Sequence, residues 1–221
     1  MHYAGICPGR FVTRLNRFVA LVELNGERQS VHVKNTGRCR ELLVSGAEVW
    51  LAPSDNPARK TKYDLICVRK DSGVLFNLDS QAPNQVVREW LEPQGFDRIQ
   101  PEYSFGRSRI DFYLERRGER WLLEVKGCTL ERNGLGYFPD APTERGTKHL
   151  RELAAAALQG YNAAVAFVMQ ADGMKTVLPN QETDPAFAAA LSDAVDAGVS
   201  VLFLPCHVEP DRLEIVGAVR L

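Results

Sequence analysis

The sequence IDFYLERRGERWLLEVK, residues 110–126, consists of two apolar, strand-forming runs separated by a short charged segment. Gly118 lies in that segment and is suited to a tight turn between two strands. We therefore expect an antiparallel hairpin in which Leu114 faces Trp121. The same register brings polar residues at the far ends of the two strands onto one face.

Two acidic residues face each other at the far end of this hairpin. Counting back from the turn, Asp111 lies opposite Glu124, and Lys126 shares the face of Glu124. Because neighbouring carboxylates repel, we expect a divalent cation to stabilise them, with the carbonyl of Val125 as a further oxygen ligand. Bound Mg²⁺ would lower the pKa of a water and hold a phosphate oxygen, while Lys126 would orient hydroxide or offset charge. The pattern suits phosphodiester hydrolysis; the alternative is a charged outer face on which Lys126 pairs with either acid.

A basic helix is predicted shortly after the hairpin, within the run GYFPDAPTERGTKHLREL, residues 136–153. Arg145, Lys148 and His149 share one face of it because their spacing follows the helical repeat. These side chains would bind the backbone phosphates of a nucleic acid. The alternative is a solvated face on which Arg145 or Lys148 pairs with Glu152.

The segment before residue 80 has the pattern of short strands broken by turn residues, with one helical turn at residues 40–44. Asn25-Gly26 is a strong signal for a hairpin between the first two strands. Five strands without a long helix favour a small barrel of the OB type, and an SH3-like barrel fits almost as well. The expected strands cover residues 17–24, 30–34, 47–52, 63–69 and 74–78.

Beyond residue 80 the pattern changes to helices and strands in the order αβββαβαβ, followed by a last strand. This order predicts a mixed sheet covered by helices, an α/β (α+β mixed) fold. The expected helices cover residues 83–92, 143–159 and 184–197. The expected strands cover residues 102–105, 108–114, 121–126, 163–169, 199–204 and 213–219.

Composition excludes several classes of protein. The chain has 221 residues, 45% hydrophobic and 25% charged, which suits one large or two small globular domains. No run approaches the roughly 18 apolar residues of a membrane span, and the N-terminus lacks the layout of a signal peptide. Five scattered cysteines without a CxxC motif favour reduced thiols. We expect a cytoplasmic protein without membrane association.

The formal net charge of -1 hides an uneven distribution along the chain. Residues 1–80 carry 12 basic against 8 acidic side chains, residues 81–170 carry 12 of each, and residues 171–221 carry 3 against 8. A polyanionic partner would therefore bind the first two segments and avoid the last. Ordinary solvated charge is the alternative.

Several segments closely resemble the sugar fermentation stimulation protein A family, and the resemblance runs over nearly the whole chain. They are RSRIDFYLE (107–115), LLEVKGCTL (122–130), GYFPDAPTERGTKHLREL (136–153), VHVKNTGRCRELL (31–43) and SDNPARKTKYD (54–64). The resemblance implies an OB-like nucleic-acid-binding domain at residues 1–80 and a PD-(D/E)xK restriction-endonuclease-like α/β domain at residues 81–221. It also implies DNA binding without sequence preference and a regulatory link to sugar (maltose) metabolism.

The resemblance assigns the residues of the hydrolytic motif one by one. Asp111 and Glu124 match its two acids and Lys126 matches its lysine, so these three are the expected catalytic residues. Ile110 replaces the usual proline, a variation that leaves the metal chemistry intact. Mg²⁺ or Mn²⁺ is the implied cofactor, bound by Asp111 and Glu124.

Further site residues follow from the same resemblance. Many enzymes of this class add an acidic metal ligand from the first helix; Glu89 is the candidate here, and Glu102, ahead of the hairpin, is the alternate. Residues of both domains are expected to contact nucleic acid: Lys34, Asn35, Arg38, Arg40, Arg109, Arg145, Lys148 and His149.

Two functions compete at this point. The first is a Mg²⁺-dependent nuclease, and the second is a DNA-binding regulator of sugar (maltose) metabolism genes that cleaves nothing physiologically. The paired carboxylates favour the enzyme, since a purely binding module has no reason to tolerate them. RNA is an alternative substrate because backbone contacts and base stacking serve both nucleic acids. No oligomeric state is predicted.

Overall fold

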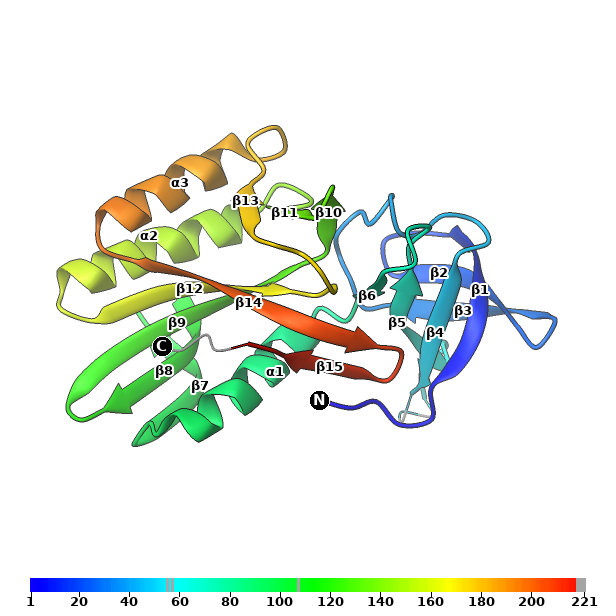
Figure 1. Cartoon of the computed structure of the whole chain (residues 1–221), viewed down its shortest axis with the longest axis horizontal. Coiled ribbons are helices and arrows are strands. Elements are labelled where there is room, and N and C mark those ends of the chain that lie inside the picture. The colour runs from blue at the N-terminus through cyan, green and yellow to red at the C-terminus, as the bar shows by residue number, and fades with distance from the viewer. Residues whose placement is uncertain (55, 57, 107, 218–221) are drawn as a thin grey trace.

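The computed structural model describes residues 1–54, 56, 58–106 and 108–217, and it shows a barrel and an α/β unit lying side by side (Figure 1). The barrel contains the N-terminal strands, and the α/β unit contains the three helices and the remaining strands. The mixed α/β architecture expected from the order of elements is confirmed. No helix in the described part of the chain is long and apolar enough to cross a membrane.

The N-terminal half is a closed barrel, as expected for an OB-like domain. Its strands are hydrogen-bonded in the order β3-β2-β1-β4-β5-β6, and a parallel pairing of β3 with β5 closes the barrel. Apolar side chains at alternating positions, such as Val22, Val31 and Leu51, fill the interior with no exposed surface. The strands are Cys7–Arg14 (β1), Val19–Leu24 (β2), Glu27–Val33 (β3), Glu48–Pro53 (β4), Tyr63–Arg69 (β5) and Leu75–Asn77 (β6).

Strand β1 is the part of the barrel that the sequence did not predict, because it contains a proline and a glycine, which are uncommon within strands. It nevertheless lies between β2 and β4. The neighbouring strands approach closely at Gly9, where an added Cβ would lie 2.8 Å from Val22. The hairpin expected at Asn25-Gly26 is confirmed: both residues have a positive φ, 52° and 80°.

The second half contains a six-stranded sheet in the order β15-β14-β12-β9-β8-β7. The three expected helices are confirmed, and the predicted range beginning at residue 213 corresponds to β15, with residues 218–221 outside the described residues. The helices are Ala82–Leu91 (α1), Glu144–Leu158 (α2) and Pro185–Asp196 (α3). The sheet strands are Arg98–Phe105 (β7), Ser108–Arg116 (β8), Glu119–Cys128 (β9), Asn162–Met169 (β12), Ser200–Glu209 (β14) and Arg212–Ile215 (β15). A 3-10 turn, Glu92–Gln94, and a small sheet of Leu130–Arg132 (β10), Leu135–Phe138 (β11) and Val177–Pro179 (β13) complete this half.

The helices cover both faces of the large sheet. Helices α2 and α3 pack together on one face, and α1 lies on the other (Figure 1). Each helix of the pair begins at a capping side chain: Thr143 accepts a hydrogen bond from the Gly146 N–H, and Asp184 accepts one from the Phe187 N–H. The sheet therefore divides the core into two layers. Helix α1 contacts β9, and α2 contacts both β8 and β9.

The β8–β9 hairpin has the expected register. Leu114 pairs with Trp121 and Phe112 pairs with Leu123. Asp111 comes next on β8, and its carboxylate accepts a hydrogen bond of 2.7 Å from the Val125 N–H of β9. The hairpin thus holds the acidic residue of β8 against the strand that carries the second one.

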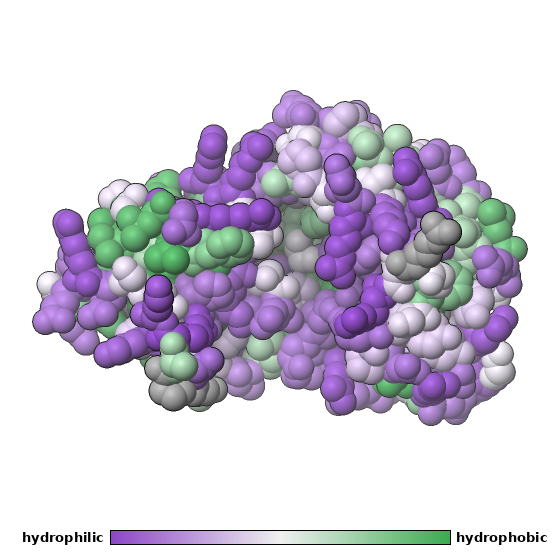
Figure 2. Space-filling model, turned by 180° about the vertical axis from the view of Figure 1, so that it is seen from behind, coloured by the Kyte–Doolittle hydropathy of each residue, from purple (hydrophilic) through white to green (hydrophobic). Residues whose placement is uncertain are grey.

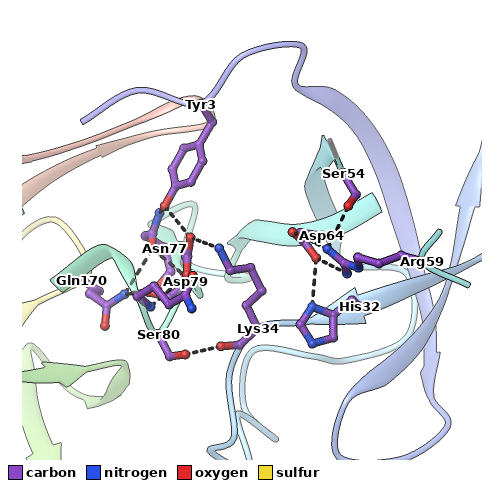
Figure 3. Close-up of polar contacts among 11 residues, drawn as sticks. Tyr3, His32, Lys34, Ser54, Arg59, Asp64, Asn77, Asp79, Ser80 and Gln170 are labelled. Carbon is purple, nitrogen blue, oxygen red and sulfur yellow. Dashed lines mark hydrogen bonds and ion pairs between the residues drawn. The ribbon is translucent and has the colours of Figure 1, made fainter. Parts of the chain in front are cut away.

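A buried polar network joins the barrel to the sheet (Figure 3). The Gln170 side-chain amide donates to the Asn77 carbonyl, the Asn77 side chain and the Asp79 carbonyl, each at 3.1 Å. The Asp79 carboxylate accepts hydrogen bonds from the Lys34 amine at 2.7 Å and the Tyr3 hydroxyl at 3.3 Å. These contacts fix the chain just ahead of α1, so the barrel and the first turn of α1 are held in one arrangement.

Gly127→Ala is expected to lower the free energy of unfolding by about 1–3 kcal/mol, measured by urea denaturation. A Cβ at Gly127 would lie 2.3 Å from the Gln170 side-chain oxygen and 2.7 Å from Pro83, so the junction must shift. The loss should be smaller in a Gln170→Ala background, where one of the two clashes is removed. Unchanged or increased stability of Gly127→Ala would contradict this packing.

Candidate active site

Glu124 lies at the centre of a buried cluster of polar side chains. It is 2% exposed, and its Oε1 accepts a hydrogen bond of 2.6 Å from the Lys126 amine. His149 of α2 shares a hydrogen bond with the same oxygen through Nδ1. The other oxygen, Oε2, is buried and has no hydrogen-bond partner among the described residues. Leaving such an atom unsatisfied is costly, so this oxygen is available to a cation.

Asp111 lies beside this cluster with both carboxylate oxygens in use. Oδ1 accepts a hydrogen bond of 2.8 Å from the side-chain amide of Asn84 on α1, and Oδ2 accepts the one from the Val125 N–H. Burial and the neighbouring charge of Glu124 raise the pKa of Asp111 above its ordinary value. Ionisation of Asp111 therefore lowers the stability of the folded protein.

Glu124 has the opposite electrostatic balance. Burial raises its pKa, but the hydrogen bond from His149 and the positive charge of Lys126 outweigh burial and lower the pKa overall. Two adjacent carboxyl groups thus have pKa values displaced in opposite directions, a feature common at functional sites. Glu124 is the acid that the protein keeps ionised.

The two acids face an open cavity of about 530 Å³ between the barrel and the sheet. Thr36 of the barrel lines this cavity together with Asn84 and Arg145 from the first turns of α1 and α2. In the space-filling view the surface is hollowed between the two halves, with hydrophilic side chains on both sides (Figure 2). The barrel therefore supplies one wall of the site.

His149 does not lie where the helical spacing alone placed it. The prediction put it on an exposed, phosphate-binding face with Arg145 and Lys148, but its side chain is 4% exposed and points to Glu124. Helix α2 is oriented so that the side of the helix carrying His149 packs against the sheet, and Leu150 and Leu153 of the same helix are buried. Arg145 is exposed at the cavity, and half-exposed Lys148 is within 3.8 Å of Glu152.

Of the four expected barrel residues, Lys34 and Asn35 have their side chains engaged within the protein, and Arg38 and Arg40 are exposed. Lys34 forms the ion pair with Asp79, whose carboxylate is 3% exposed, so its amine is engaged inside the junction. Asn35 is buried, and its side-chain oxygen accepts a hydrogen bond of 2.7 Å from the Gly37 N–H. Arg38 and Arg40 are exposed, as a contact with nucleic acid requires.

Glu89 and Glu102 line a neighbouring cavity of about 560 Å³ together with Asp111, but neither lines the cavity that also contains Glu124. Its carboxylate accepts hydrogen bonds from the amino group of Met1 at 2.8 Å and the Gln85 amide at 2.9 Å. Glu102, the alternate, is exposed and paired with Arg109 at 2.9 Å. Within the described ranges, no three histidine, cysteine or acidic side chains are grouped so that they could hold a metal ion.

The sequence did not indicate the structural roles of three residues: Asn84, Arg14 and Asp140. The Arg14 guanidinium donates to four backbone carbonyls at 2.7–2.8 Å, three of them in the loop at residues 35–38. Asp140, ahead of α2, accepts a hydrogen bond of 2.9 Å from the Cys39 N–H across the junction. Their partners lie far away in the sequence, so only the folded chain shows these roles.

The protein thus consists of a closed OB-like barrel followed by an α/β sheet. A carboxylate pair with an adjacent lysine lies where the two parts meet. Two family models match the chain: "SfsA N-terminal OB domain" over residues 12–76 and "Sugar fermentation stimulation protein RE domain" over residues 81–212. The chain belongs to the sugar fermentation stimulation protein family.

Named relatives of this family are similar along almost their whole length. The homolog from Desulfitobacterium hafniense (strain DSM 10664 / DCB-2) is 50% identical over 217 residues, covering 97% of this chain and 95% of that protein. The homolog from Ruminiclostridium cellulolyticum is 45% identical over 225 residues, covering 100% and 99%. The structure of Pyrococcus furiosus SfsA in complex with Ca²⁺ has 28% identity and a TM-score of 0.87, covering 98% of this chain and 96% of that one.

Asp111→Asn and Glu124→Gln are expected to change stability in opposite directions in metal-free protein at neutral pH, each on the order of 1 kcal/mol. The raised pKa of Asp111 means that ionisation weakens the fold, so the neutral amide should raise the free energy of unfolding. Asn at position 111 can still accept from the Val125 N–H, and a flipped Asn84 amide can accept from it. The lowered pKa of Glu124 means that ionisation strengthens the fold, so Glu124→Gln should lower stability.

Both differences should disappear at low pH, because wild-type Asp111 and Glu124 are then protonated in the folded and the unfolded chain. The Glu124 contribution is lost as pH falls through its lowered folded pKa, and the Asp111 penalty is lost as pH falls through its raised folded pKa. Urea denaturation in EDTA across this pH range measures both. A change of the same sign in the two variants at neutral pH would contradict the assigned electrostatics.

Proposed function

We propose that this protein is a divalent-metal-dependent nuclease that hydrolyses DNA without sequence preference. The observation that carries the proposal is the pair of buried Glu124 and partly buried Asp111, with Lys126 hydrogen-bonded to Glu124 and one Glu124 oxygen without a hydrogen-bond partner among the described residues. Burial and the neighbouring charge of Glu124 make the ionised form of Asp111 costly, and a cation bound between the two carboxylates would offset that cost. The geometry is therefore better suited to hydrolysis than to binding alone.

Asp111 and Glu124 would hold the metal, and the residues present fit it. Both supply carboxylate oxygens, which Mg²⁺ and Mn²⁺ prefer, and Glu124 Oε2 has no competing donor in the described part of the chain. A bound ion of this type would supply an activated water and hold a phosphate oxygen. The Pyrococcus furiosus relative is in complex with Ca²⁺, which supports binding of a divalent cation in the family.

The protein's own residues would fix the acids and compensate charge. His149 and Lys126 hold Glu124 in one orientation and keep it ionised, while Asn84 orients Asp111. The Lys126 side chain is 12% exposed and lines the cavity, so its amine is placed to offset negative charge that develops on a phosphate.

Basic side chains on both sides of the cavity would hold the DNA backbone. Arg145, Lys148 and Arg109 line an adjoining pocket on the side of α2. Arg38 and Arg40 are exposed in the barrel segment that follows Thr36, which lines the cavity. Such contacts go to phosphates and carry no sequence information, so we expect binding without sequence preference.

We propose that the two domains have different main functions. Residues 1–80 would form the domain that binds DNA, and residues 81–221 would form the domain that carries hydrolysis. Since its substrate would be cellular DNA, we place the protein in the cytoplasm. Its five cysteines are all free thiols, which suits a reducing compartment.

The test is a cleavage assay on linear duplex and single-stranded DNA and RNA with Mg²⁺, Mn²⁺ or EDTA. We expect DNA cleavage that needs the metal and is abolished in EDTA. Glu124→Gln and Lys126→Met should each reduce the rate by roughly 100-fold or more, because Glu124 would hold the metal and Lys126 would offset charge on the reacting phosphate, while DNA affinity changes little. Glu214→Gln, which removes an exposed carboxylate on β15, is the matched control and should cut like the wild type.

Binding of DNA without cleavage of any substrate would contradict the nuclease and leave a DNA-binding regulator of sugar (maltose) metabolism genes. Cleavage of RNA but not DNA would contradict the substrate class. Full activity of Glu124→Gln would contradict the assignment of the site.

A further inference from the structure

The turn between β1 and β2 presents two apolar side chains to solvent. Leu15 is 55% exposed and Phe18 is 51% exposed, although aromatic side chains are usually buried. The turn is rigid, because the Asn16 side-chain oxygen accepts hydrogen bonds from the Phe18 N–H at 2.9 Å and the Val19 N–H at 3.0 Å. An exposed ring on a fixed turn is a candidate for a contact with another molecule.

This turn is bound to the loop that forms the barrel wall of the active site. The Arg14 guanidinium donates to the Arg17 carbonyl of the turn and to the carbonyls of Asn35, Gly37 and Arg38 in the loop. Thr36, inside that loop, lines the cavity that contains Asp111. One side chain therefore fixes the position of the turn relative to the carboxylates.

A second cavity, of about 260 Å³, connects the two places. Arg17 lines it on the side of the turn, and Thr36 and Thr143 line both this cavity and the one that contains the carboxylates. The surface path from the carboxylates thus passes Thr36 and reaches Arg17, the residue directly before Phe18. A strand of nucleic acid that left this cavity past Arg17 would come next to the Phe18 ring, because the Arg17 guanidinium lies against that ring.

Exposed arginines of the turn and the barrel loop lie near the path, of which Arg17 lines the second cavity together with one acidic residue, Asp140. Arg17, Arg38 and Arg40 are exposed, and within the described residues none of them has a carboxylate in ion-pair distance, whereas Lys34, Lys70 and Arg59 nearby in the barrel do. The Arg17 guanidinium lies 5.8 Å from the centre of the Phe18 ring. Positive charge next to an exposed aromatic ring is the combination that holds a phosphate and stacks the attached base.

We propose that Phe18 stacks against an unpaired base of the DNA strand that runs through the active site, with Arg17 on its phosphate. This inference rests on the proposed function and names the substrate class: DNA with a single-stranded segment, such as an overhang or a frayed end. Bases within an intact duplex are already stacked on both faces and offer none to Phe18. The turn would therefore favour DNA that contains an unpaired segment, whatever its base sequence.

The test is a fluorescence-anisotropy titration of labelled single-stranded DNA, blunt duplex and duplex with an overhang, in EDTA and in Ca²⁺. Phe18→Ala should weaken binding to the single-stranded and overhang probes by roughly tenfold or more and leave the blunt duplex unchanged. Phe18→Trp should retain affinity, and its added tryptophan emission should be quenched by single-stranded DNA, with wild type titrated in parallel. Leu158→Ala is the matched control, since Leu158 is 79% exposed at the far end of α2.

Each outcome decides between the claims. Equal losses on all probes, or no loss on any of them, would overturn the stacking site while leaving the nuclease intact. Absence of DNA binding by the wild type in both buffers would instead overturn the proposed function, and this inference with it. If Phe18→Trp retained its affinity for single-stranded DNA but its tryptophan emission were not quenched, the ring would contribute to binding without contacting a base. This result would also overturn the proposal.

Discussion

Two carboxylates, Asp111 and Glu124, are held side by side across the β8–β9 hairpin, largely removed from water. The surrounding donors come from several elements: the Lys126 amine from β9, His149 from α2, Asn84 from α1 and the Val125 N–H from the hairpin itself. The donors on Glu124 lower its pKa, whereas burial and the neighbouring charge raise that of Asp111, so repulsion is only partly compensated. A fold that keeps such a pair accepts reduced stability at the position where a cation would be most strongly bound.

The barrel is part of this site and not a separate attachment. The Lys34–Asp79 ion pair and the Gln170 amide fix the chain before α1, which in turn positions Asn84 against Asp111. On the other side, Asp140 binds the backbone of the barrel loop at Cys39. Movement of the barrel would therefore disturb both the orientation of one acid and the wall of the cavity.

The hairpin register could be predicted from the sequence because a strand alternates with a period of two, so one turn glycine fixes every facing pair. The helices could be predicted from the spacing of their apolar residues. The role of His149 could not: helical spacing shows which residues share a face, but not that this face packs against a buried acid. The same holds for Lys34, since its partner Asp79 lies 45 positions away. Glu89, the predicted third ligand, is bound by the Met1 amino group, a contact over 88 positions that no local pattern contains.

Anomalous diffraction from crystals of this protein soaked in Mn²⁺ tests the central claim most directly. We expect a strong peak bonded to oxygens of both Asp111 and Glu124, and loss of that peak in Glu124→Gln crystals soaked in the same way. The distances to both carboxylates should be those of direct metal–oxygen bonds, roughly 2.0–2.3 Å. No peak at the pair, or a peak only at another acidic cluster such as Asp172 and Glu209, would contradict a metal site at the hairpin and the hydrolytic function built on it.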